Sequence, residues 1–212
     1  RLDSKVTVRI GEVDVAVACW VYELGGISGA KKPVLFLDTD LEENPEYFRK
    51  VCHKLYQGDK KDRLVQEMIL GIGGVKMLES LGYSIKKYHM NEGHTSFLAL
   101  ELYKNSTAPD KLEDVRNKCV FTTHTPVPAG HDIFDEGLVR ELAGDYIPDR
   151  SEIDIFDGGV LNMTQLAFKF SRYTNGVARK HKKTSRMMFP EHEIESITNG
   201  IHALSWTAGP FR

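Results

Sequence analysis

The sequence lacks the long apolar runs and the dense cysteines that mark two large classes of protein. No run approaches the ~20 apolar residues that span a bilayer, so we do not expect a membrane protein. The three cysteines, Cys19, Cys52 and Cys119, are far apart and lie in apolar surroundings. That pattern is typical of reduced core thiols rather than a zinc site or a disulfide framework. We therefore expect a reducing, cytoplasmic compartment.

Strong charge of one sign is also lacking. The formal net charge is -2, so the chain has no general electrostatic attraction to nucleic acid, and a neutral or small anionic substrate fits better. The eight histidines show no HExxH spacing, and the run Glu191-His192-Glu193 is typical of a solvated loop. We predict no metal site. The basic run from Arg179 to Arg186 is most often a solvated helix face.

The composition is that of a globular protein with 41% hydrophobic and 27% charged residues. A chain of 212 residues can bury roughly 70% of its unfolded surface. Without repeats or a linker, residues 1–212 are predicted to form a single α/β domain, with a β-hairpin region at its edge in residues 1–30. Both ends stop abruptly, so we expect sheet edges that favour self-association into a homo-oligomer.

Hydrophobic periodicity predicts the strands of this domain. Alternation over residues 6–10 and 13–17 indicates a hairpin, and the uniformly apolar run 33–38 indicates a strand covered on both faces of a parallel sheet. Further strands are predicted near 85–88 and at 119–123. Helices predicted at 95–104 and 111–117 separate these two strands, which describes a right-handed βαβ crossover.

The helices follow from apolar residues at helical spacing. A long helix is predicted from Leu64 to Leu81, with Gly82 capping its end. Its glycine-rich stretch LGIGGVKML follows no strand, so it is not a dinucleotide fingerprint, and the glycines indicate close helix packing. The remaining predicted elements are a helix at 136–143, a helix at 163–177 that Asn175-Gly176 interrupts, and a strand at 196–198.

Three of the predicted strands each lead into an unusual polar loop. Tyr88 leads into HMNEGH, Thr123 into HTPVPAGH and Thr198 into NGIH. Open parallel sheets bind ligands beyond the carboxyl ends of their strands, where helix N-termini also point their N–H groups. We therefore expect the three loops to converge on one cleft.

Each of these loops also has a purely structural interpretation. Asn91 can cap the following helix while Glu92 complements its macrodipole, or Glu92 and His94 can face a ligand. His124 can be a core histidine satisfied by the backbone, or a donor that a proline-stiffened loop holds ready for a ligand. Asn199 can belong to a plain Asn-Gly turn. The residues alone leave these alternatives open.

Four segments together resemble one known family. They are YHMNEGHTSFLALE, VFTTHTPVPAGHDIF, LNMTQLAFKFSRYTNGVARKHKKTSRMMF and ITNGIHALSW, and LYQGDKKDRLVQEMILGIGGVKMLESLG fits just upstream. In this order they resemble the α-glucan (glycogen/maltodextrin) phosphorylases, in particular the short bacterial and archaeal branch. The resemblance covers the chain from about Pro33 onward. It implies part of the N-terminal lobe of a two-lobed GT-B glycosyltransferase, a Rossmann-like, mostly parallel sheet with helices on both faces.

The resemblance also implies an activity and site residues. The family transfers a terminal glucosyl unit of an α-1,4-glucan to inorganic phosphate, which gives glucose 1-phosphate. His124 matches the catalytic histidine that hydrogen-bonds the glucosyl unit and whose backbone carbonyl faces the developing positive charge. The residues that match substrate-binding positions are Asn199, Glu92, His94, Asn91 and Asp59. Longer members have Asn-Asp-Thr-His where this chain has NEGH.

The loop Gly58-Asp59 corresponds to a shortened active-site gate, and Arg63 and Glu67 fall in the helix after it. The family cofactor is pyridoxal phosphate, but its attachment lysine has no match in this chain. The resemblance therefore predicts a fragment that supplies the sugar-binding wall, is inactive alone and needs a C-terminal lobe. The alternatives are a lobe of a nucleotide-sugar-dependent glucan synthase and a non-catalytic α-glucan-binding module.

Overall fold

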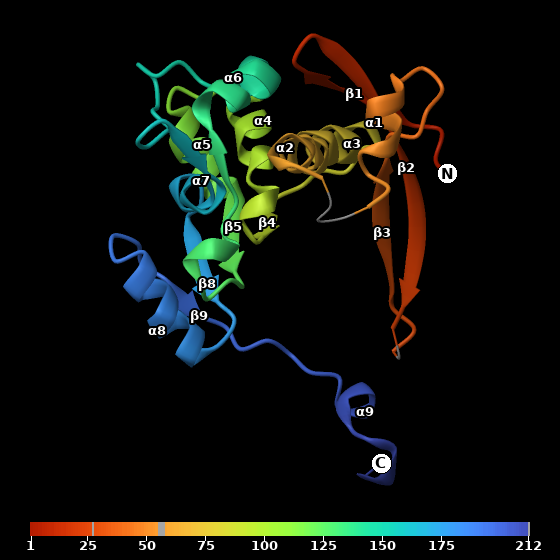
Figure 1. Ribbon diagram of the computed structural model, residues 1–212. Helices are drawn as coiled ribbons and strands as arrows, with labels where there is room; N and C mark the ends of the chain where they lie inside the picture. Colours follow the sequence, from red (N-terminus) through yellow and green to blue (C-terminus); the bar gives the residue numbers. More distant parts are fainter. Residues whose placement is uncertain (27, 55–57, 212) are drawn as a thin grey trace.

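The structure, a computed structural model, describes residues 1–26, 28–54 and 58–211. Its strands form two main sheets and one short ribbon, with helices between and around them (Figure 1). The strands are β1 (Lys5–Ile10), β2 (Val13–Gly25), β3 (Lys31–Asp38), β4 (Tyr88–Asn91), β5 (Cys119–Thr123), β6 (Ile133–Asp135), β7 (Val160–Asn162), β8 (Tyr173–Gly176) and β9 (Glu195–Ser196).

The helical elements connect these strands. The α-helices are α1 (Glu46–Lys50), α2 (Lys60–Met68), α3 (Gly74–Ser80), α4 (Phe97–Asn105), α5 (Lys111–Lys118), α6 (Glu136–Ala143), α7 (Met163–Lys169), α8 (Arg179–Met188) and α9 (Ala203–Trp206). A π-helical segment, η1 (Ile69–Gly73), joins α2 to α3, and the 3-10 turns are η2 (Gly93–Thr95), η3 (Pro128–Gly130), η4 (Gly144–Tyr146) and η5 (Gly209–Phe211). None of the helices in the described ranges has the length and apolar character needed to cross a bilayer.

The predicted hairpin is confirmed and forms part of an antiparallel sheet in the order β1-β2-β3. Val8 lies opposite Val15, and both are fully buried because alternate side chains of a strand share one face. Gly11 turns the chain between the two strands with φ +57°, a conformation that glycine adopts without steric cost. The sheet extends away from the body of the molecule as an arm made by β2 and β3 (Figure 1).

The prediction that residues 33–38 form a strand covered on both faces of a parallel sheet is wrong. β3 pairs antiparallel with β2, and Phe36 and the opposing Trp20 are about half exposed. β3 is an edge strand, a position that tolerates Pro33, which has no N–H to donate to a strand ladder. A uniformly apolar run carries no alternation, so it does not distinguish a covered strand from an arm open on both sides.

The second sheet is parallel throughout, in the order β4-β5-β8-β9. The predicted βαβ unit is present, since α4 and α5 lie between the parallel neighbours β4 and β5. Met90 of β4 and Phe121 of β5 are neighbours in register and fully buried. Phe121 meets Phe168 of α7 edge-on, with ring centroids 5.3 Å apart. The α/β class, with a parallel sheet flanked by helices, is confirmed.

Three predicted boundaries were wrong near this sheet. The strand expected at 85–88 lies at Tyr88–Asn91, and the strand expected at 196–198 lies at Glu195–Ser196. The single helix expected over 163–177 ends after Lys169, and Tyr173–Gly176 forms β8. Tyr173 continues the helical spacing, but β8 inserts between β5 and β9, whose hydrogen bonds outweigh the local pattern. Asn175-Gly176 therefore ends a strand and does not interrupt a helix.

The long helix predicted from Leu64 to Leu81 is confirmed as α2, η1 and α3 in succession. Gly71 lies in η1 against α4, where an added Cβ would lie 2.6 Å from the backbone nitrogen of Leu98. Gly82 ends the helix with φ +77°, and its N–H and that of Tyr83 donate back to the carbonyls of Glu79 and Leu78, a Schellman motif. The predicted close packing is thus confirmed for Gly71 and the predicted helix cap for Gly82, whereas Gly74 has open space where a Cβ would lie.

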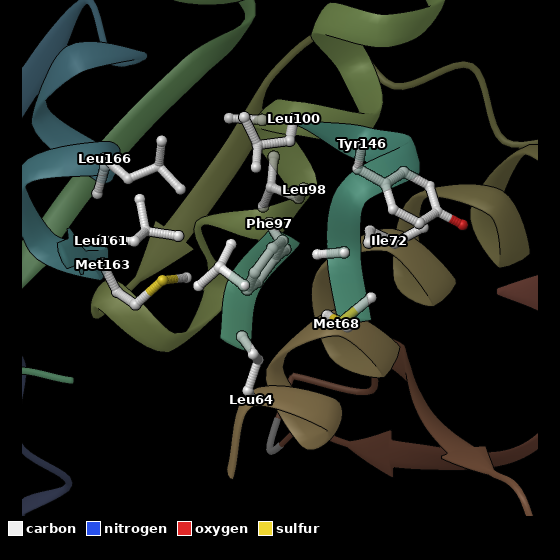
Figure 2. Packing of buried hydrophobic residues seen from close by; sticks show 14 of the residues in the cluster. Leu64, Met68, Ile72, Phe97, Leu98, Leu100, Tyr146, Leu161, Met163 and Leu166 are labelled. Atoms are coloured by element: carbon white, nitrogen blue, oxygen red, sulfur yellow. The ribbon is translucent and has the colours of Figure 1, made fainter. Parts of the chain in front are cut away.

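One continuous core joins this helix to the parallel sheet (Figure 2). Leu64, Met68 and Ile72 of the long helix lie on one side of Phe97, and Met163 lies on the other. All five side chains are nearly or fully buried. The shared core fixes the start of α2 relative to the carboxyl edge of the parallel sheet.

Candidate functional site

The carboxyl ends of the four parallel strands lie at one edge of the sheet, because every neighbouring pair is parallel. The loops after β4 and β5 and the segment after β9 all leave from this edge, as the strand pattern predicts. Their placement differs, however. The loops after β4 and β5 contact each other directly, whereas Asn199 lies beyond β8, where its N–H donates to the carbonyl of Val177 at 3.1 Å.

Glu92 ties the first two loops together. Its Oε2 accepts from the His124 backbone N–H at 2.7 Å and from Thr125 Oγ1 at 2.8 Å, while Oε1 accepts from the Gly93 N–H at 3.1 Å. Within the described residues it is the one non-glycine with positive φ, at φ 78° and ψ 163°. Such a backbone costs about 1–3 kcal/mol and persists only where its surroundings fix it. Glu92, and not Asn91 as predicted, therefore caps η2, and its carboxylate also contacts the loop of His124.

His124 itself is exposed at the start of its loop, which rules out the core-histidine interpretation. The far end of the loop is also held in place. His131 Nδ1 lies 2.8 Å from Thr164 Oγ1, and the Met163 N–H donates to the carbonyl of Asp132 at 3.0 Å. Burial lowers the pKa of His131, with nearby carboxylates acting in the opposite direction. The loop is thus anchored at one end to Glu92, directly after β4, and at the other to the start of α7.

The start of α7 also holds the NEGH segment. Ser96 Oγ donates to the carbonyl of Met163 at 2.8 Å, and a Cβ on Gly93 would lie 2.9 Å from Thr164 Oγ1. Glycine is therefore required for this close approach. His94 lies in η2, and its pKa is lowered, first by burial and then by the charge of Arg63. A neutral imidazole is able both to donate and to accept a hydrogen bond.

A buried charge network lies beside His94. The Arg63 guanidinium contacts Asp132 Oδ2 and Glu67 Oε1, each at 2.9 Å. Glu67 is 1% exposed, and burial, reinforced by Asp132, raises its pKa to about 9 although Arg63 acts in the opposite direction. Nearby, Lys60 Nζ donates to the carbonyl of Ile133 at 3.2 Å.

The remaining predicted site residues lie around this centre. Asp59 caps α2, and both of its capping bonds, from the N–H groups of Lys61 and Asp62, go to Oδ1. Gly58 of the predicted gate has φ +91°. Residues 55–57, which begin the segment LYQGDKKDRLVQEMILGIGGVKMLESLG, lie outside the described residues. Asn91 is the exposed last residue of β4.

Sequence reasoning missed several residues that organise the site, namely Thr125, Asp132 and Thr164. Arg63 and Glu67 were noted in the helix after the gate loop without a role. Asp132 pairs with Arg63 across a separation of 69 residues, which no local pattern reveals. The close packing of Gly93 against α7 could have been predicted from its place in a loop after a strand, since glycine is used where the backbone must approach another group closely.

The cluster offers carboxylates, imidazoles and an amide, which are hydrogen-bonding partners for a polyol. The described residues include no group of three or more histidine, cysteine, aspartate or glutamate side chains arranged to hold a metal ion. A cofactor bound as a Schiff base needs a lysine amine, and Lys60, the lysine described beside the cluster, is engaged by the Ile133 carbonyl. These residues therefore do not fit attachment of such a cofactor.

The fold and this edge define an α/β protein whose polar loops gather where parallel sheets bind their ligands. No family model matches the chain. The glycogen phosphorylase of Mycobacterium tuberculosis is 34% identical over 239 aligned residues, with 96% of this chain and 27% of that protein covered. The maltodextrin phosphorylase of Thermococcus litoralis is 34% identical, with 80% of this chain and 23% of that protein covered. The glycogen phosphorylase of Aquifex aeolicus is 31% identical, with 98% and 32% covered.

The chain therefore belongs to the glycogen and maltodextrin phosphorylase family, which confirms the resemblance seen in its motifs. It spans between about a quarter and a third of the length of these relatives.

Proposed function

We propose that the chain is part of the N-terminal lobe of an α-1,4-glucan phosphorylase and supplies its sugar-binding wall. The complete protein would transfer a terminal glucosyl unit to inorganic phosphate and release glucose 1-phosphate. Family membership supports the reaction class. One observation supports the site assignment above all. Glu92 Oε2 accepts the His124 backbone N–H at 2.7 Å, which joins the loops at the ends of two parallel strands.

The proposed roles follow from this arrangement. His124 is the catalytic residue: its imidazole contacts the glucosyl unit, and its backbone carbonyl faces the positive charge that develops at the anomeric carbon. Groups fixed before the substrate arrives stabilise such charge without reorganising. Asn91, Glu92 and His94 bind glucosyl hydroxyls from the loop after β4. Asp59 and Asn199 bind them from the start of α2 and from the segment after β9.

The other components lie outside this chain in the proposal. Pyridoxal phosphate would be held by residues of a C-terminal lobe, not by this chain, and would supply acid–base chemistry there. The residues of this chain bind and orient the α-1,4-glucan, while phosphate or glucose 1-phosphate lies against the other lobe. The chain alone is then inactive. The three free thiols support a cytoplasmic location.

The first test compares the complete polypeptide with the isolated chain. Phosphorolysis of maltoheptaose is measured as glucose 1-phosphate release, and we expect turnover by the complete polypeptide and none by residues 1–212. Turnover with a nucleotide sugar, but not with phosphate, would instead favour the glucan synthase. Glucan binding without either reaction would favour the non-catalytic module.

The second test addresses His124. His124→Gln in the complete polypeptide is expected to lower kcat for phosphorolysis by about 10²-fold, the usual effect of removing one positioned polar group from a transition state. His53→Gln is the matched control, since His53 is an exposed histidine after α1 that pairs with Asp40. An unchanged kcat in His124→Gln would refute the assignment.

A further inference from the structure

The loop from His124 to His131 is anchored to three separate elements. At its start, Glu92 accepts the His124 N–H. At its end, the His131 ring contacts Thr164 of α7. One residue further on, Asp132 meets Arg63 of α2 at 2.9 Å. The third contact lies at the greatest sequence distance, and no assigned function requires it.

The contact between Arg63 and Asp132 is well placed to transmit a constraint. The Arg63 side chain is 18% exposed and that of Asp132 is 32% exposed, so water screens this pair less than a surface ion pair. Arg63 is also fixed on its other side by the buried Glu67 at 2.9 Å. Asp132 has a fixed backbone as well, since its carbonyl accepts the Met163 N–H. Neither partner can shift without breaking a second contact.

The chain segments that precede Arg63 and Asp132 both contain proposed site residues. Arg63 lies one helical turn after Asp59, and Asp132 directly follows the loop that begins with His124. Lys60 adds a second link between the same two segments through the Ile133 carbonyl. The contact thus joins the gate side of the site to the catalytic loop.

We propose that Arg63 and Asp132 are positioning residues that set the loop of His124 relative to the start of α2. The inference rests on the proposed function, because it concerns the same site. Neither side chain is assigned contact with the substrate. They act through His124. Their effect therefore appears in kcat, the rate of the chemical step, more than in the affinity for glucan.

The test uses the complete polypeptide and two readouts. Hydrogen–deuterium exchange with mass spectrometry follows the peptides that cover residues 124–132, and phosphorolysis gives kcat and KM. The variants are Arg63→Gln, Asp132→Asn and the conservative Arg63→Lys. Arg150→Gln is the matched control, because Arg150 contacts Glu136 at 3.0 Å on the surface, away from the site.

In Arg63→Gln and Asp132→Asn, we expect exchange in residues 124–132 to rise about tenfold. We also expect kcat to fall about tenfold or more with little change in KM, because small displacements of a reacting group are costly. Arg63→Lys should recover part of both effects, and Arg150→Gln should show neither. Asp132→Asn keeps the fold testable if Arg63→Gln fails to fold, since it leaves Glu67 and Arg63 together.

Unchanged exchange over residues 124–132 in folded Arg63→Gln and Asp132→Asn would overturn the inference, as would faster exchange with unaltered kcat. A protein that shows no phosphorolysis at all would refute the proposed function instead. In that case the exchange measurement alone still decides whether the contact positions the loop.

Discussion

Glu67 should make the stability of this protein fall as pH rises, in a way that one substitution removes. Burial is the main cause that raises its pKa from 4.5 to about 9, and the neighbouring carboxylate of Asp132 adds to it. The folded state therefore keeps the Glu67 proton over a pH range in which the unfolded chain releases it. Its contribution to stability is fully present below pH 4.5 and is lost as the pH rises towards 9.

The magnitude follows from linkage. A group protonated only in the folded state changes the free energy of unfolding by about 1.4 kcal/mol per pH unit. Between pH 6 and pH 8, Glu67 should thus reduce stability by at most about 3 kcal/mol. Glutamine has the shape of the protonated acid and cannot lose a proton in this range. The free energy of unfolding of Glu67→Gln should therefore rise relative to that of the wild type as the pH rises.

The assay is urea denaturation of the wild type and of Glu67→Gln at pH 6, 7 and 8, followed by circular dichroism. Glu46→Gln is the control, since Glu46 is exposed and Lys50 keeps its pKa low, so it stays ionised throughout this range. The difference in the free energy of unfolding between wild type and variant should change with pH for Glu67 and stay constant for Glu46. A constant difference for Glu67 would show that the buried carboxyl is already ionised at pH 6 and would refute the reasoning.

Three further measurements test other parts of the structure. Gly71→Ala should destabilise the fold by about 1–3 kcal/mol in urea denaturation, because its Cβ would lie 2.6 Å from a backbone atom. Gly74→Ala, which has open space around its Cβ, should stabilise the fold by about 0.5–1 kcal/mol. Equal effects of the two substitutions would contradict the packing. Burial and, after it, the charge of Arg63 lower the pKa of His94, so Arg63→Gln should raise that pKa in an NMR titration, and a fall would contradict the geometry. Burial raises the pKa of the Cys119 thiol to about 12, so a thiol reagent should label it no faster than the protein opens, and rapid labelling of the native state would contradict its burial.

Much of the fold was readable where the signals are local. The strand at 119–123 and the helix at 136–143 were predicted with the bounds that the structure shows. The first is a β-branched and aromatic run. The second begins after Asp135, whose side chain accepts from the N–H groups of Gly137 and Leu138. In both cases, the residues that define the element lie within it or directly beside it.

The predictions that failed concern elements whose partners lie far away in the sequence. Tyr173–Gly176 gives a mixed local signal, since Tyr and Thr favour strands while Asn and Gly disfavour them, and its hydrogen bonds come from β5 and β9. Residues 33–38 were assigned to the wrong sheet because an apolar run does not reveal its partner. The same limit applies to the site. The position of His124 followed from the end of a strand, but the contact between Arg63 and Asp132 depends on how the core orients α2.

These two kinds of information meet in the loop of His124, the proposed catalytic residue. The sequence places His124 at the edge of a parallel sheet and stiffens the following residues with two prolines, which reduces the entropy that ordering the loop costs. Stiffness alone does not fix a direction, because a rigid loop can still pivot at its ends. Glu92 at the start and Arg63 at the end remove that freedom, and each does so with a charged group. In its strained backbone conformation, Glu92 brings its carboxylate to the His124 N–H while its own N–H donates to the Thr122 carbonyl, and these contacts help to hold that conformation.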